Sequence, residues 1–115
     1  MLAAFHSYLS AIGDGNWAEA CTLLSTPVKT QLKQLLSHAK GISGHGCAVA
    51  LAALLGRTPA SLRQKQEPSS VVGVRILGDH AFVLYRSPQF PHATLSMARE
   101  SGRWTAGVLA AAGAP

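Results

Sequence analysis

The feature that most constrains the fold is a change of hydrophobic period near residue 71. Before it, apolar residues recur every three or four positions, as at Leu2, Phe5, Leu9 and Ile12, which is the spacing of one face of a helix. From Val71 onward apolar and polar residues alternate, as in a strand with one buried face. The sequence therefore predicts a helical first half followed by a sheet, which is an α+β arrangement.

We expect three to four helices within residues 1–56. Asn16 and Thr26 are residue types that cap helix starts, and Gly56 is of the type that ends a helix. Residues 57–70 contain Pro, Ser, Gln and Lys and are predicted to form a surface connection with one turn of helix inside it.

Two tight turns set the expected register of the sheet. Gly78-Asp79 and Ser101-Gly102 each lie between alternating runs, which indicates two-residue hairpins. Counting outward from the turns gives each hairpin one apolar face. The opposed pairs expected on these faces are Ile76/Ala81, Val74/Val83 and Val72/Tyr85, and then Arg99/Trp104, Met97/Ala106 and Leu95/Val108. We predict one cone-like α+β domain, in which the helices pack on one face of a four-stranded antiparallel sheet over residues 71–110.

Length and charge narrow the functional classes. At 115 residues and 12.0 kDa the chain has the size of one domain. Its apolar stretches are shorter than the roughly 20 residues of a membrane-spanning helix, so no transmembrane segment is predicted. The formal charge is +5, but the ten basic residues are scattered along the chain. We interpret this charge as a solvated surface and not as a nucleic-acid footprint.

The two cysteines, Cys21 and Cys47, leave two interpretations open. They form neither a C-x-x-C pair nor a zinc ligand set. Either they are two small buried side chains in a reducing compartment, or they form one disulfide that stabilises the fold by about 3–4 kcal/mol. Both cysteines lie on the faces of predicted helices that point toward the core. This placement is compatible with a disulfide between them but does not require one.

Catalytic chemistry has little support in the sequence. A general acid–base site needs a buried carboxylate or imidazole, and the acids are expected in turns, at helix starts and at strand ends. His38, His45 and Cys47 do not have the spacing of a metal site. We therefore predict no catalytic residue, no metal site and no cofactor.

Two sets of residues are candidates for binding. Inside the domain, Tyr8, Tyr85, Met97 and Trp104 either pack the core or line a pocket for a small apolar ligand, with the Tyr85 hydroxyl as its polar contact. On the wetter face of the first hairpin, arginines flank apolar side chains, which indicates a protein partner or a homodimer seam. This second set comprises Phe82, Leu84, Arg75 and Arg86. The alternative is that long arginine stems simply cover their neighbours.

Four short segments carry a family resemblance. They are Gly13–Ser25 (GDGNWAEACTLLS), Gly46-Cys47-Ala48, Val74–Val83 (VRILGDHAFV) and Glu100–Trp104 (ESGRW). Together with the order of helices and strands they resemble the nuclear-transport-factor-like (cystatin-like, cone-shaped) superfamily, and within it small secreted or lipid-anchored bacterial proteins. The resemblance implies an extracytoplasmic domain in which Cys21 is joined to Cys47.

That superfamily contains isomerase-like and dehydratase-like enzymes as well as binding and accessory domains. We expect a non-enzymatic extracytoplasmic binding or accessory domain here. The alternative is a small-molecule isomerase or dehydratase that uses the interior of the cone. No signal peptide precedes Met1 and no lipid-attachment cysteine is present, so the location is inferred from the resemblance and from the disulfide that it implies, with a leader taken to be missing.

Overall fold

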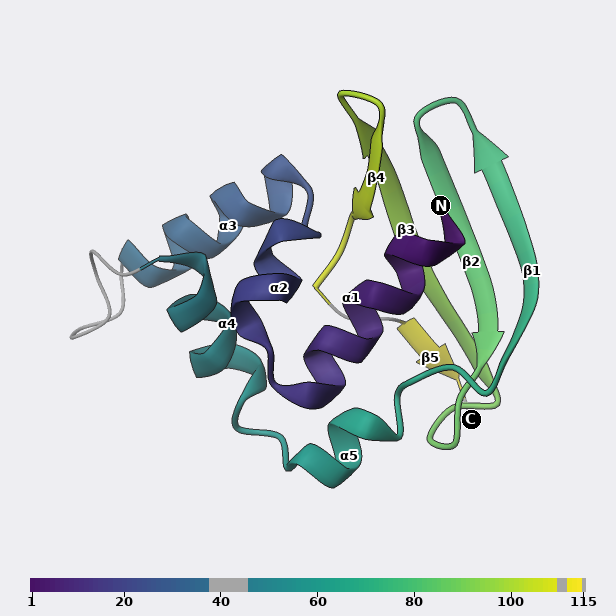
Figure 1. Ribbon diagram of the computed structural model, residues 1–115, viewed down its shortest axis with the longest axis horizontal. Coiled ribbons are helices and arrows are strands. Elements are labelled where there is room, and N and C mark those ends of the chain that lie inside the picture. Colours follow the sequence, from purple (N-terminus) through teal and green to yellow (C-terminus); the bar gives the residue numbers. More distant parts are fainter. Residues whose placement is uncertain (38–45, 110–111, 115) are drawn as a thin grey trace.

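A computed structural model describes residues 1–37, 46–109 and 112–114, and it confirms the α+β prediction (Figure 1). Five helices pack against an antiparallel sheet within these residues. The helices are α1 (Leu2–Asp14), α2 (Trp17–Thr22), α3 (Thr26–Ser37), α4 (Cys47–Leu55) and α5 (Ala60–Gln64). The strands are β1 (Ser70–Leu77), β2 (His80–Arg86), β3 (His92–Glu100), β4 (Arg103–Ala106) and β5 (Ala112–Ala114). Helix α5 occupies the connection where one turn of helix was expected.

The sheet has the strand order β1-β2-β3-β4, and each neighbouring pair is antiparallel. Both hairpin turns are of the primed types that match strand twist. In the first turn only Gly78 has a positive φ, of 64°, and in the second both Ser101 and Gly102 do, at 51° and 78°. The register next to each turn is the predicted one, with Leu77 opposite His80 and Glu100 opposite Arg103.

One extra residue in β1 changes the predicted pairing at the far end of the first hairpin. The register shifts between Val71 and Gly73, so that Val71 is opposite Tyr85. The predicted pair Val72/Tyr85 is therefore wrong. Val71 is half-buried against the core, whereas Val72 is 60% exposed. A β-bulge of this kind places two residues opposite one, and alternation could not locate it because both candidates are valine.

The last predicted strand is shorter than expected. β4 ends at Ala106, so the expected pair Leu95/Val108 is not part of the sheet. Residues 112–114 return as β5 and pair with His92–Thr94, on the edge of β3 that β2 does not occupy. At Ala106 the chain also pairs with a segment of the helical half: its N–H donates to the Leu23 carbonyl, and its carbonyl accepts from Ser25. This tertiary contact has no signal in the local pattern.

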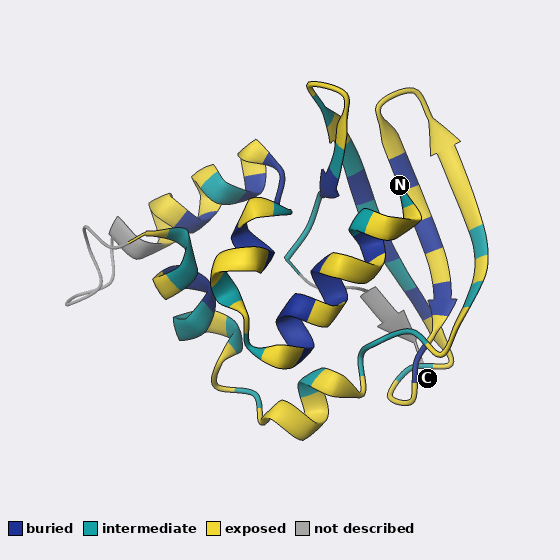
Figure 2. Ribbon diagram, in the orientation of Figure 1, coloured by how far each residue is buried: buried dark blue, intermediate teal, exposed yellow. Residues whose placement is uncertain are grey.

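The core lies between α1 and the inner face of the sheet and continues among α2, α3 and α4 (Figure 2). Its largest fully buried side chains come from both halves of the chain. They are Phe5, Tyr8, Leu24, Leu32, Leu51, Val83, Tyr85, Leu95 and Met97. Helix α2 packs on α4, and the Cys21–Cys47 disulfide joins these two helices with a Cα separation of 6.0 Å. The structure thus confirms the pairing that the resemblance implied.

Candidate functional site

The four residues predicted to line an apolar pocket lie together in the core. Tyr8, Tyr85 and Met97 are at most 2% exposed, and Trp104 is half-buried against the same cluster. The Tyr85 ring meets Phe5 edge-on, with the ring centroids 5.1 Å apart, a favourable geometry for aromatic pairs. The structure therefore shows these residues as packed side chains, and their role in ligand binding stays a prediction.

Both tyrosine hydroxyls are held in the neutral form. The Tyr8 hydroxyl donates a hydrogen bond to the Leu109 carbonyl at 2.5 Å. Burial raises the pKa of Tyr8 far above its usual value and raises the pKa of Tyr85 to about 12, because a phenolate loses its hydration inside the protein. Each hydroxyl therefore keeps its proton, and can donate a hydrogen bond, at an alkaline pH where an exposed tyrosine would ionise.

The described carboxylates and imidazoles lie at the surface. Each Asp, Glu and His side chain in these residues is exposed or half-buried. Asp79 forms an ion pair with Arg99, with Oδ1 and Nη2 3.0 Å apart, and Glu100 accepts hydrogen bonds from Thr26. These two acids therefore tie elements of the fold together. His38 and His45, which the sequence analysis weighed as metal ligands, lie outside the described residues.

A polar hollow of about 400 Å³ runs along the exposed side of α1. His6, Ser10 and Asp14 of α1 contribute to its lining, as does Glu19 of α2. This hollow is not among the binding regions predicted from the sequence. The available signal was the spacing of His6, Ser10 and Asp14, which are four residues apart and so share one helix face.

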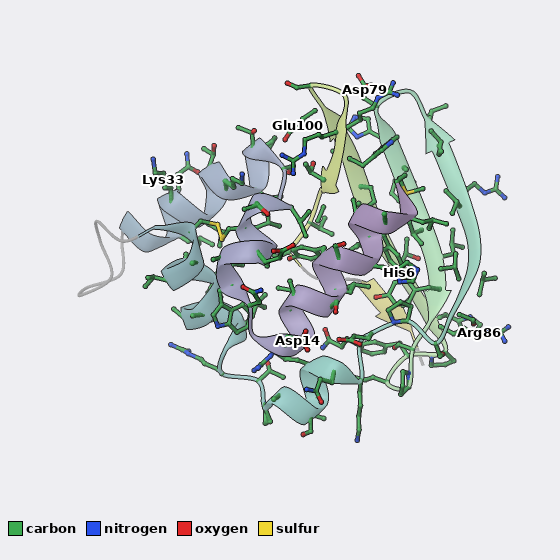
Figure 3. The ribbon with its side chains drawn as sticks, viewed as in Figure 1. His6, Asp14, Lys33, Asp79, Arg86 and Glu100 are labelled. Atoms are coloured by element: carbon green, nitrogen blue, oxygen red, sulfur yellow. A yellow bond between two sulfur atoms is a disulfide. The ribbon has the colours of Figure 1, made fainter. Side chains whose placement is uncertain are left out.

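A second and more apolar hollow, of about 270 Å³, lies between α3 and α4. It is lined by Lys29 and Lys33 of α3 and by the first turn of α4, including Cys47. Figure 3 shows Lys33 pointing out from α3 toward solvent. Its lining combines aliphatic groups with two ammonium groups, and the sequence analysis did not predict it.

The most exposed apolar region is the β1–β2 hairpin. Figure 2 shows exposed residues along most of β1, whereas buried and exposed residues alternate on β2. Six large apolar side chains of this hairpin are at least 38% exposed. They are Val72, Val74, Ile76, Leu77, Phe82 and Leu84.

The exposure of β1 follows from its place at the edge of the sheet. Among the described residues, β2 is the one strand that pairs with it. Val74 and Ile76 are opposite the buried residues Val83 and Ala81, as predicted, yet they are 38% and 59% exposed. The core-facing side of the first hairpin is therefore covered along β2 and open along β1, which corrects the expectation that both strands bury this side.

The four predicted interface residues share the outer face of the hairpin. Phe82 is opposite Arg75, Leu84 is opposite Gly73, and Arg86 follows two residues after Leu84. All four side chains are exposed. Figure 3 shows Arg86 at the end of the sheet away from Asp79, pointing outward. Neither β1 nor β2 contains a carboxylate, so this face is both apolar and cationic. We call these four residues, with the exposed side chains of β1, the hairpin surface.

Comparisons of the chain with family models, with curated proteins and with solved structures found no significant match. Within the described ranges, no helix has the length and apolar character needed to cross a bilayer. The disulfide is compatible with an extracytoplasmic location, where such bonds persist.

Proposed function

We propose that this chain is an extracytoplasmic binding or accessory domain that engages a protein partner through the hairpin surface. The observation that carries the proposal is the concentration of exposed apolar side chains beside Arg75 and Arg86 on one hairpin. Contiguous apolar patches rimmed by polar groups are typical of interaction sites, and arginine is enriched in such sites.

Two further observations support this proposal over the alternative of a small-molecule enzyme. The interior residues Tyr8 and Tyr85 are packed side chains of the core. The described acids and histidines are exposed or half-buried at the surface and not in the core. The disulfide supports the extracytoplasmic part of the proposal, and the order of helices and strands supports a relationship with the cone-shaped superfamily.

The test compares two double variants of the domain. Phe82→Ser with Leu84→Ser removes apolar area from the hairpin surface. Val49→Ser with Leu54→Ser removes a similar area from α4, where both side chains are also exposed. Each protein is used as immobilised bait for the extracellular proteins of the source organism, and captured partners are then titrated individually.

The expected result is a saturable partner that binds the wild type and the α4 variant alike. The hairpin variant should bind it about tenfold or more weakly, as truncation of a central apolar contact predicts. Equal affinities for all three proteins, or an equal loss in both variants, would contradict the proposal. Circular dichroism of each variant checks that the fold is retained.

A further inference from the structure

We infer that the partner of the hairpin surface is an extended segment, alternating apolar and acidic residues, that adds to the sheet as a strand along the free edge of β1. This inference rests on the proposed function and specifies the chemistry of the partner. It is carried by the open edge of β1, by apolar side chains on one side of that edge, and by Arg75 on the other side, which has no ion-pair partner in the described part of the chain.

The backbone of β1 offers the hydrogen bonds that such a strand needs. In a two-residue hairpin the pair that flanks the turn, here Leu77 and His80, is hydrogen-bonded, and bonded pairs alternate along the strand. Arg75 therefore bonds to Phe82, and the N–H and C=O groups of Val74 and Ile76 point away from β2. Added strands bind edges of this kind through main-chain hydrogen bonds.

The second half of β1 lacks the usual protection of a sheet edge. Proteins guard edge strands with proline, bulges, charges or a covering element. The bulge of β1 lies between Val71 and Gly73, so it limits pairing there and leaves Val74–Leu77 regular. This four-residue stretch contains no proline and one charge, that of Arg75.

The residues exposed on the inner and outer sides of the sheet at β1 indicate which side chains a partner strand should have. Val74 and Ile76 are exposed on the inner side, so a neighbouring strand buries apolar area there by placing apolar residues beside them. Arg75 is exposed on the outer side and has no ion-pair partner among the described residues. Since residues of a strand alternate between sides, the complementary strand alternates apolar and acidic side chains.

Charge also argues against a second copy as the occupant. Neither strand of the hairpin contains a carboxylate to face the arginine of another copy. Each chain has a formal charge of +5, so two hairpins placed edge to edge would bring like charges together. An acidic segment of another protein removes that repulsion.

The test uses short synthetic peptides and the full domain. One peptide alternates valine and glutamate, and a second alternates valine and lysine. We expect the glutamate peptide to bind, to protect the Val74 and Ile76 amides from hydrogen exchange, and to bind about tenfold more tightly than the lysine peptide. Arg75→Glu should reverse this preference, whereas Arg57→Glu, at an exposed arginine outside the hairpin, should not.

A second variant tests the edge itself. Val74→Pro removes an N–H that points away from β2, so it should abolish peptide binding while β1 and β2 stay paired. Equal binding of the two peptides, or unchanged exchange at Val74 and Ile76, would overturn the inference. So would sedimentation as a dimer with these amides protected, because the occupant would then be a second copy. If the natural partner is lost in the Phe82 and Leu84 variant but retained by Val74→Pro, the proposed function stands and the edge inference fails.

Discussion

The carboxylate of Glu100, at the end of β3, accepts hydrogen bonds from the backbone N–H of Thr26, the first residue of α3. The distances from that nitrogen to Oε1 and Oε2 are 3.0 and 3.1 Å. The Thr26 hydroxyl also lies 3.3 Å from Oε1. Sequence analysis placed the helix cap at Thr26. In the structure the carbonyl of Ser25 accepts the first helical bond, from Lys29, so the cap lies one residue earlier and a strand supplies the anion at the helix start.

Replacement of Glu100 by glutamine should lower the free energy of unfolding by about 1 kcal/mol, because the charge at the start of α3 is lost. Urea denaturation measures the change. Asp14→Asn is the charge-matched control, since Asp14 is an exposed acid at the C-terminal end of α1 and not at a helix start. An effect of Glu100→Gln no larger than that of the control would show that the contact with Thr26 adds nothing to stability.

Removal of the Tyr8 hydroxyl should destabilise the protein more than removal of the Tyr85 hydroxyl. Tyr8→Phe leaves the Leu109 carbonyl without its donor, which costs about 1–3 kcal/mol where the acceptor is shielded from water. Tyr85→Phe keeps a ring of the same shape in the same core and serves as the control. Equal unfolding free energies for the two variants would contradict this account of the Tyr8 bond.

The two tyrosines also make stability depend on alkaline pH. The pKa of Tyr85 rises from 10.0 to about 12 on folding, and the pKa of Tyr8 rises further. Between pH 10 and pH 12 the tyrosines of the unfolded chain have lost protons that those of the folded protein still hold. The free energy of unfolding is therefore unaffected by these two groups below pH 10, and it falls as the pH rises from 10 toward 12. The absorbance of tyrosinate should therefore stay low near pH 10 in the folded protein. In protein unfolded with urea, the same absorbance should rise near pH 10. A rise near pH 10 in both states would refute the prediction.

The disulfide between Cys21 and Cys47 should be chemically testable. These are the two cysteines of the chain, so protein unfolded without reductant should contain no titratable thiol. Reduction should lower the free energy of unfolding by about 3–4 kcal/mol, through the added freedom of the unfolded chain. A variant with serine at both positions should show the same loss without reductant. Two thiols per chain in the unreduced protein would show that the bond does not form.

Part of the hairpin surface was predictable because turn chemistry is local. Gly78-Asp79 sets the register of the first hairpin, and that register puts Phe82 and Arg75 opposite each other. Alternation then puts Leu84 and Arg86 on the same side as Phe82. The face of each residue thus follows from neighbours a few positions away. The position of the bulge could not be predicted from local pattern. Val71 and Val72 are both valine, so alternation does not indicate which of them faces the core.

The sequence by itself determined where the chain is helical, where it turns, and, outside the bulge of β1 and the end of β4, which side chains share a face, since periods and turn residues act over a few positions. Tertiary structure alone decided which of those faces are covered. Val74 and Ile76 have the pattern of buried residues and are exposed because β1 lies at the sheet edge. Burial depends on which distant segments meet, and those contacts join residues that are not neighbours in the chain.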